Sequence, residues 1–330
     1  MGLTQFNTAL GLTNLGLSAI GFAVVISKLN QIDYRIKDLQ SSILELQEKI
    51  DRLSIAKIKS AIDVAEVALR MSSSSNRKRL VAEVIQPLIE AEHYYQSEWD
   101  SDWNKRGGIM GREYILILSL AYITEVKCYL ELEEHEMALK RLAEAEETVR
   151  PRIKSYVKHL LTKNPSGYLH LACKGVNLSD ILEILKYITG ELDTDKLFDQ
   201  YLRKSIFNCK DIESWIESIP VGSRNAALAH IKPSLVGKDW DFWAYLPWNT
   251  SARKEAIFEL LSQTYKVIEV IHSMIELDRR LEGYRYEISE MSRLGLSYQE
   301  WKKLVLPPEN LDNNSNSKVL LLLPGHDLPT

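Results

Sequence analysis

Apolar residues recur every three or four positions along the N-terminal part of the chain, which is the pattern of a helix with one buried stripe. The stripe keeps this spacing for four heptads without a polar residue. Its members are Leu29, Ile32, Ile36, Leu39, Ile43, Leu46, Ile50 and Leu53. Because no Pro or Gly lies between residues 22 and 71, the pattern predicts one uninterrupted coiled-coil helix over residues 28–71. We expect the stripe to pack against helices of the same chain, including 252–281, or against a second copy.

Residues 1–27 form an apolar N-terminal segment that carries no charged side chain. Its core of 17 residues, Leu10–Ile26, would be about 25 Å long as a helix, at the short end of the range that spans a bilayer. The candidate membrane-inserting residues are Leu10, Leu12, Leu15, Leu17, Ile20, Phe22, Val24, Val25 and Ile26. Three interpretations stay open: a helix buried in the core, a permanent anchor, or a helix that is hidden first and inserted later.

The remaining sequence predicts a helical body over residues 76–305. Its expected elements are a helical hairpin at 112–148, several shorter helices, and a second long helix within 252–294 that packs on the bundle. Residues 306–330 are rich in Pro, Asn and Ser and predict a mobile tail that ends in an apolar run at 319–323. The predicted fold class is all-α: an elongated helical bundle with a long N-terminal coiled-coil helix and a helical-hairpin body.

Composition narrows the function classes. The 330 residues carry a net charge of -4, so we expect no nucleic-acid partner that is bound through bulk positive charge. The three cysteines are widely spaced and odd in number, which favours a reducing compartment. We therefore expect a cytoplasmic protein, with membrane association only on activation.

Two further segments are candidates for binding. A basic patch follows the acidic stretch that ends at Glu147, and it consists of Arg150, Arg152, Lys154, Lys158 and Lys163. Such a run favours anionic partners, or it is a solvated helix face. The densest aromatic segment contains Trp240, Trp243 and Trp248, which predict an interface or a packed loop.

The search for catalytic chemistry identifies no nucleophile or nucleotide motif. Two Glu-x-x-His pairs, Glu90/His93 and Glu269/His272, have the spacing of di-iron bundles, with Glu66 and Glu125 as further ligands. Helical geometry places Glu90 opposite its apolar stripe and Glu269 well off its own, which argues against a metal site. We therefore expect no enzymatic activity, no bound cofactor and no bound metal ion.

Within the predicted hairpin, Tyr129, Ala138, Leu142, Ala145 and Pro151 resemble a single tetratricopeptide-type unit over 119–152. The order of elements in residues 1–70, an apolar segment followed by a coiled coil, resembles α-helical pore-forming proteins and bell-type cell-death effectors. That resemblance implies a latent N-terminal helix that a trigger releases and that oligomerisation concentrates at a membrane.

Two functions from different classes follow. The first is a membrane-active helical effector whose apolar N-terminal helix inserts into or permeabilises a membrane as an oligomer, with membrane lipid as a conditional partner. The alternative is a soluble helical adaptor that binds protein partners, or itself, through the coiled coil, the hairpin and the Trp-rich segment.

Overall fold

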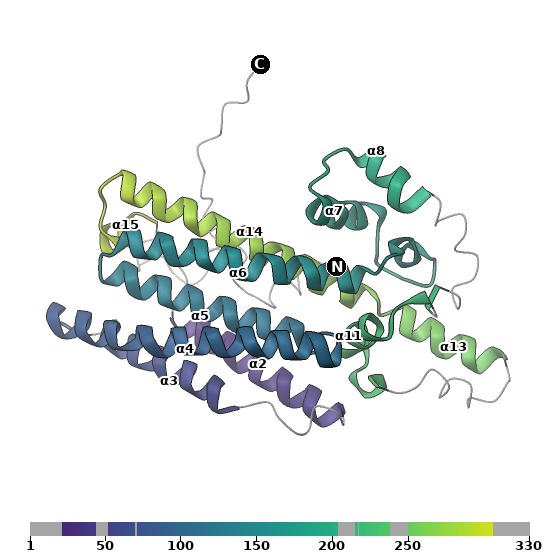
Figure 1. Ribbon diagram of the computed structural model, residues 1–330, viewed down its shortest axis with the longest axis horizontal. Coiled ribbons are helices and arrows are strands. Elements are labelled where there is room, and N and C mark those ends of the chain that lie inside the picture. The colour runs from purple at the N-terminus through teal and green to yellow at the C-terminus, as the bar shows by residue number, and fades with distance from the viewer. Residues whose placement is uncertain are drawn as a thin grey trace, which may run out of the picture.

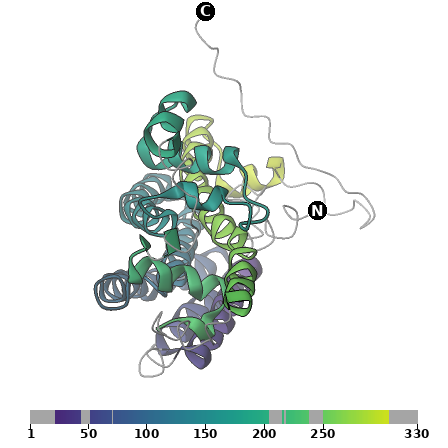
Figure 2. The ribbon, with the colours of Figure 1, turned by 90° about the vertical axis from the view of Figure 1, so that its right-hand side faces the viewer.

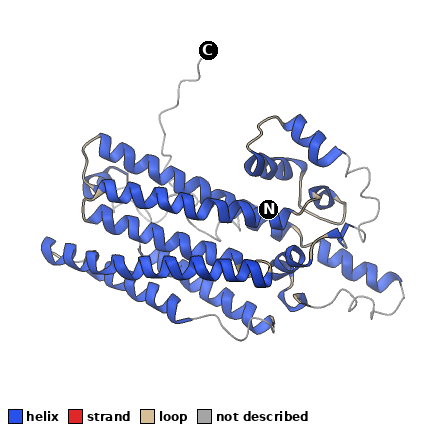
Figure 3. Ribbon diagram, viewed as in Figure 1, coloured by secondary structure: helices blue, strands red, loops and turns tan. Residues whose placement is uncertain are grey.

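The computed structural model describes residues 22–43, 52–69, 71–203, 215–216, 218–237 and 250–305. Within these ranges every regular element is a helix and there is no strand (Figure 3), so the predicted all-α fold is confirmed. The longer helices are α2 (Phe22–Ser42), α3 (Arg52–Leu69), α4 (Ser74–Arg106), α5 (Gly111–Glu131), α6 (His135–Leu161), α7 (Leu178–Thr189), α11 (Val221–Ile231), α13 (Thr250–Leu261), α14 (Tyr265–Arg293) and α15 (Tyr298–Val305). The shorter ones are η3 (Pro165–Leu169), α8 (Thr194–Leu197), η4 (Phe198–Arg203) and η5 (Pro233–Leu235).

The long helices lie side by side in an elongated bundle (Figure 1). α3 packs on α4, α4 on α5, α5 on α6, and α6 on α14, while α2 covers α3 and α5. The loops at 107–110 and 132–134 are short, so their helices are antiparallel neighbours. Viewed from the end, α2 and α3 form one edge of the bundle (Figure 2).

Helix α5 is the centre of the bundle. Every residue of α5 except Arg112 and Tyr129 is buried, because α4, α6, α2, α3 and α15 surround it. Two of its buried hydroxyl groups bond within the helix: Ser119 Oγ donates to the carbonyl of Ile115, and Thr124 Oγ1 to that of Leu120. The predicted hairpin does form from α5 and α6, but α5 leaves little surface for a partner protein.

The turn between α4 and α5 requires glycine. Gly107 has a φ of 66°, and a Cβ atom there would lie 2.7 Å from Gly222 Cα. The buried Asp102 carboxylate accepts hydrogen bonds from the Met110 backbone N–H at 3.0 Å and from Arg106 Nε at 2.8 Å. The turn therefore fixes the start of α5 against α11, which contains Gly222.

The prediction of one helix over residues 28–71 is wrong. α2 ends at Ser42 and α3 begins at Arg52, and Lys59 Nζ lies 3.5 Å from Asp33 Oδ2. In a single straight helix these residues would be about 39 Å apart, so the chain has folded back on itself. Ile55, Ile58 and Ile62 of α3 share the core with the stripe of α2. One long helix and two successive helices that each bury one stripe have the same local repeat of apolar residues. The repeat therefore could not distinguish them.

The second long helix is also divided. α13 ends at Leu261 and α14 begins at Tyr265, and α14 then continues through Gly283 to Arg293. The hydroxyl groups of Ser262 and Thr264 donate to the carbonyls of Glu259 and Leu261, which competes with the regular helical pattern. α14 packs mainly on α6, α7 and α11, whereas the stripe of α2 packs on α3 and α5. The expected packing of that stripe on 252–281 is thus replaced by packing on helices nearer in sequence.

Candidate functional site

A cavity lies where the middle of α2 meets the first half of α5. Its volume is about 110 Å³. It is lined by Lys28, Gln31, Ile32, Arg35, Arg112, Glu113, Leu116 and Leu120. Three of these side chains are cations and one is a carboxylate, so the lining carries two more positive charges than negative ones.

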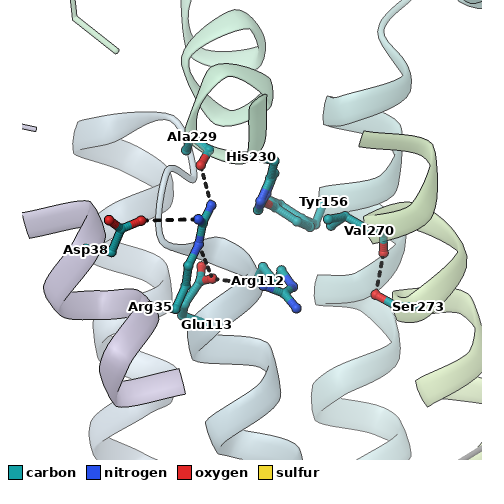
Figure 4. A network of polar contacts seen from close by, with 9 residues as sticks. All are labelled: Arg35, Asp38, Arg112, Glu113, Tyr156, Ala229, His230, Val270 and Ser273. Atoms are coloured by element: carbon teal, nitrogen blue, oxygen red, sulfur yellow. Dashed lines mark hydrogen bonds and ion pairs between the residues drawn. The ribbon is translucent and has the colours of Figure 1, made fainter. Parts of the chain in front are cut away.

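Arg35 connects α2 to the rest of the molecule at this cavity (Figure 4). Its Nη2 donates a hydrogen bond to the carbonyl of Ala229 in α11. Its Nε lies 3.8 Å from Glu113 Oε1 in α5, and its Nη1 lies 3.5 Å from Asp38 Oδ2 on its own helix. One guanidinium therefore joins three helices.

Glu113 is the buried carboxylate of the cavity, with a side chain that is only 1% exposed. Arg112 Nη1 lies 3.4 Å from Glu113 Oε1, so both arginines face the same oxygen atom. Within the described residues, Glu113 Oε2, Arg35 Nε and Arg112 Nε are buried without a hydrogen-bond partner. The site thus has polar atoms whose bonding capacity is unused.

The excess of positive charge is visible in the neighbouring titratable groups. Burial lowers the pKa of Lys28, and the guanidinium of Arg112 lowers it further. Burial also lowers the pKa of His230 well below its usual value, with smaller contributions from Arg112 and Arg35. His230 is therefore neutral, and its Nε2 is hydrogen-bonded to Tyr156 Oη at 2.7 Å.

A second buried cluster of charges lies further along α5. Arg141 of α6 contacts the carboxyl groups of Glu92, Glu125 and Glu144, with Nε 2.8 Å from Glu125 Oε2. Burial raises the pKa of Glu92 to about 9, and the charge and hydrogen bonding of Glu125 add to this against the lowering effect of Arg141. Glu92 consequently holds a proton at neutral pH, and it can donate this proton in a hydrogen bond to the carboxylate of Glu125.

The basic patch is divided between structural and accessible residues. Arg150 Nε donates to both carboxylate oxygens of Asp278 in α14, at 2.8 and 3.1 Å, and Tyr187 Oη donates to the same carboxylate. Arg152 donates to the Thr148 carbonyl and lies 3.6 Å from Asp100. Lys154 Nζ lies over the ring of Tyr187, at 5.7 Å from its centroid, whereas Lys158 and Lys163 are exposed. The two arginines hold the bundle together, and the lysines are the accessible part of the patch.

The stripe of α2 is buried within a single chain. Leu29, Ile32, Ile36, Leu39 and Ile43 are at most 7% exposed. Leu46 and Ile50 lie outside the described residues, as does the side chain of Leu53. Burial of the stripe agrees with the predicted packing against helices of the same chain.

Most of the predicted insertion and aromatic residues fall outside the described part of the chain. Leu10, Leu12, Leu15, Leu17 and Ile20 do so, as do Trp240, Trp243 and Trp248 and the side chains of Phe22, Val24 and Ile26. Val25 is described and is buried. Among the described helices, none is both long enough and apolar enough to span a bilayer.

The Glu-x-x-His pairs do not converge. Glu90 and His93 are exposed on α4, and His272 lies 3.9 Å from Asp180. Glu125 is held by Arg141 instead. No group of three or more potential metal ligands occurs in the described ranges.

Sequence reasoning missed the cavity residues Arg35, Arg112 and Glu113. One local signal was present: Arg112 and Glu113 are a charged pair directly before the apolar run that begins at Tyr114, where charge is costly to bury. Nothing local connects them with Arg35, because the contact depends on how α2 folds over α5.

Comparison of the chain with protein-family models, with curated proteins and with solved structures gives no match.

Proposed function

We propose that this chain is a membrane-active helical effector, in which the segment 10–26 is withheld until activation and then inserts into a membrane as an oligomer. The observation that supports the proposal is the position of α2. The uncharged segment runs directly into α2, and α2 lies at the edge of the bundle with one buried stripe. A peripheral helix can leave the bundle without disrupting the central helix α5.

The stripe of α2 supports oligomerisation after release. After Leu29, Ile is the residue at one core position of each heptad, and after Ile32, Leu is the residue at the other. This arrangement favours parallel two-stranded coiled coils. A released α2 would expose Leu29, Ile36 and Leu39, which are fully buried in the bundle. Pairing with the same stripe of another copy would bury these side chains again, so the oligomer would offset the apolar exposure that release costs.

Oligomerisation also suits the composition of the apolar segment. Thr13, Asn14 and Ser18, together with Gly11, Gly16 and Gly21, make a solitary membrane span unfavourable. Several such helices side by side can share polar contacts, and the small residues permit a close approach. The parallel pairing of α2 would bring these segments together at one point of a membrane.

Arg35 is the polar part of the attachment. It binds α2 to the carbonyl of Ala229 and to the carboxylate of Glu113. Charged contacts of this kind weaken when a competing ion binds one partner, whereas apolar contacts do not. The attachment of α2 therefore contains a contact through which a trigger can act.

The test compares dye release from liposomes by the full chain, by a chain lacking residues 1–27, and by the Ile20→Asp variant. A charge at the centre of an inserted helix costs about 2.5–3.5 kcal/mol, so Ile20→Asp should abolish release. Leu171→Asp is the matched control, because Leu171 is 95% exposed and its substitution should leave release unchanged. Circular dichroism and thermal melting check that each variant keeps its fold.

Loss of release by an intact Ile20→Asp protein supports insertion. If the full chain neither binds nor permeabilises liposomes, or if the chain lacking residues 1–27 does so equally well, the proposal is wrong. The helical adaptor, bound to protein partners or to itself, then remains.

A further inference from the structure

We propose that the cavity between α2 and α5 binds a compact oxyanion of the phosphate class, with Lys28, Arg35 and Arg112 as its donors. The proposal concerns binding alone and does not depend on membrane insertion. It starts from the charge of the lining, which contains three cations and one carboxylate.

The two arginines cannot relieve their repulsion by losing a proton, because a guanidinium stays charged in proteins. Glu113 offers one charge to both of them, and its Oε1 is the atom that each approaches. Asp38 compensates Arg35 from the exposed side at 3.5 Å. An anion inside the cavity would give both guanidinium groups a further partner of negative charge.

Unused donors point toward the same ligand. Arg112 Nε is buried without a hydrogen bond to any described residue, and so is Arg35 Nε, whose ion-pair partner Glu113 Oε1 lies 3.8 Å away. A buried donor without an acceptor costs about 1–3 kcal/mol, and more when it is charged, so an acceptor of negative charge gains most from both. Phosphate oxygens match the planar fork of arginine, which donates two parallel hydrogen bonds.

The cavity has a suitable size. Its volume of about 110 Å³ compares with about 30 Å³ for one water molecule in the liquid. It therefore accommodates a single tetrahedral oxyanion, whereas a whole nucleotide would not fit. Gln31, exposed at its edge on α2, leaves an approach from solvent.

The chemistry of the ligand admits two sources, a free phosphate monoester or the phosphate of a lipid headgroup. Titration calorimetry of the full chain with inorganic phosphate, and separately with soluble dihexanoyl phosphatidic acid, distinguishes them at constant ionic strength. Similar affinities identify a free phosphate group as the ligand, and much tighter binding of the phosphatidic acid identifies a headgroup.

Three variants of residues that line the cavity test whether the anion binds there. Arg112→Gln and Lys28→Met should each weaken binding by about ten-fold or more, because each removes a charged donor. Glu113→Gln should strengthen binding, because it removes the carboxylate that competes with the anion. Structural damage alone would weaken binding in all three. Arg79→Gln is the control, since Arg79 is an exposed arginine of α4 that pairs with Glu83.

Because Glu113→Gln is expected to raise the affinity rather than lower it, the test stays informative even if Arg112→Gln fails to fold. Absence of binding by both probes would overturn the proposal. So would binding that the cavity variants and Arg79→Gln change equally, because such binding would lie elsewhere on the surface.

Discussion

Two clusters of buried charged residues contain side chains of α5. One has an excess of carboxyl groups, and the other has an excess of cations. Around Arg141 there are three carboxyl groups, Glu92, Glu125 and Glu144, for one cation. Around the carboxylate of Glu113 there are three cations for one anion. The first cluster reduces its excess when Glu92 takes up a proton, because burial and Glu125 raise the pKa of Glu92 to about 9. The two arginines of the second cannot do the same by losing a proton, since a guanidinium keeps its charge.

The difference suggests different roles for the two clusters. The Arg141 cluster joins α4, α5 and α6 in the centre of the bundle, and the proton on Glu92 offsets part of its excess negative charge. The cavity around Glu113 lies under the peripheral helix α2, and its two arginines keep buried donors without a hydrogen bond to any described residue. A cluster that adjusts its own charge contributes to structure, whereas fixed charges beside a cavity are suited to a ligand.

The largest expected effect is the loss of Arg141. Arg141→Gln removes the guanidinium that pairs with all three carboxyl groups of the cluster, and we expect the free energy of unfolding to fall by about 3–5 kcal/mol. Arg112→Gln should cost less than about 2 kcal/mol, because Glu113 keeps Arg35 and the cavity admits solvent. Urea unfolding at neutral pH measures both. Equal losses would show that the two clusters do not differ.

The pH dependence tests the protonation of Glu92. Between about pH 4.5 and about pH 9 the folded protein keeps a proton on Glu92 that the unfolded chain has lost. The unfolded state then binds fewer protons, so stability falls as the pH rises through this window, by at most about 1.4 kcal/mol per pH unit. Glu92→Gln should flatten this slope in urea unfolding. A slope that persists unchanged in this variant would place its origin in another group.

A smaller effect is expected at the attachment of α2. Arg35→Gln removes the interactions with Glu113 and with the Ala229 carbonyl, which should cost about 1–2 kcal/mol and speed hydrogen exchange in α2. Lys37→Gln is the matched control. Lys37 forms an exposed ion pair with Asp33 on the same helix, and its loss should cost less than about 0.5 kcal/mol. If exchange in α2 does not distinguish the two variants, Arg35 is not part of the attachment.

The smallest effect on stability is expected from the accessible lysines of the basic patch. Replacing Lys154, Lys158 and Lys163 by Glu should cost at most about 1 kcal/mol, mainly through the interaction between Lys154 and Tyr187. Binding to anionic liposomes should weaken and should depend on salt in the parent protein. If flotation with anionic liposomes is unchanged in this variant, these lysines do not form a binding surface for anionic lipid.

The prediction from sequence was best where the signal was local. The described part of the stripe of α2 is buried as its spacing implied. The prediction was incomplete for the basic patch, because the partner of Arg150 is Asp278 on a helix 128 positions away. It missed the cavity, whose two sides come from α2 and α5.

The sequence by itself determined that this chain is helical and which face of α2 is buried, because periodicity over three or four residues is a property of one helix turn. Only the tertiary structure decided that α2 and α3 are separate helices that pack on each other, and which charges meet. Arg35 and Ala229 are 194 positions apart, and no local pattern relates them. Their contact exists because α2 folds over α5 and the glycine turn before α5 admits α11. Packing of whole helices, rather than propensity, brought the charges of the cavity together.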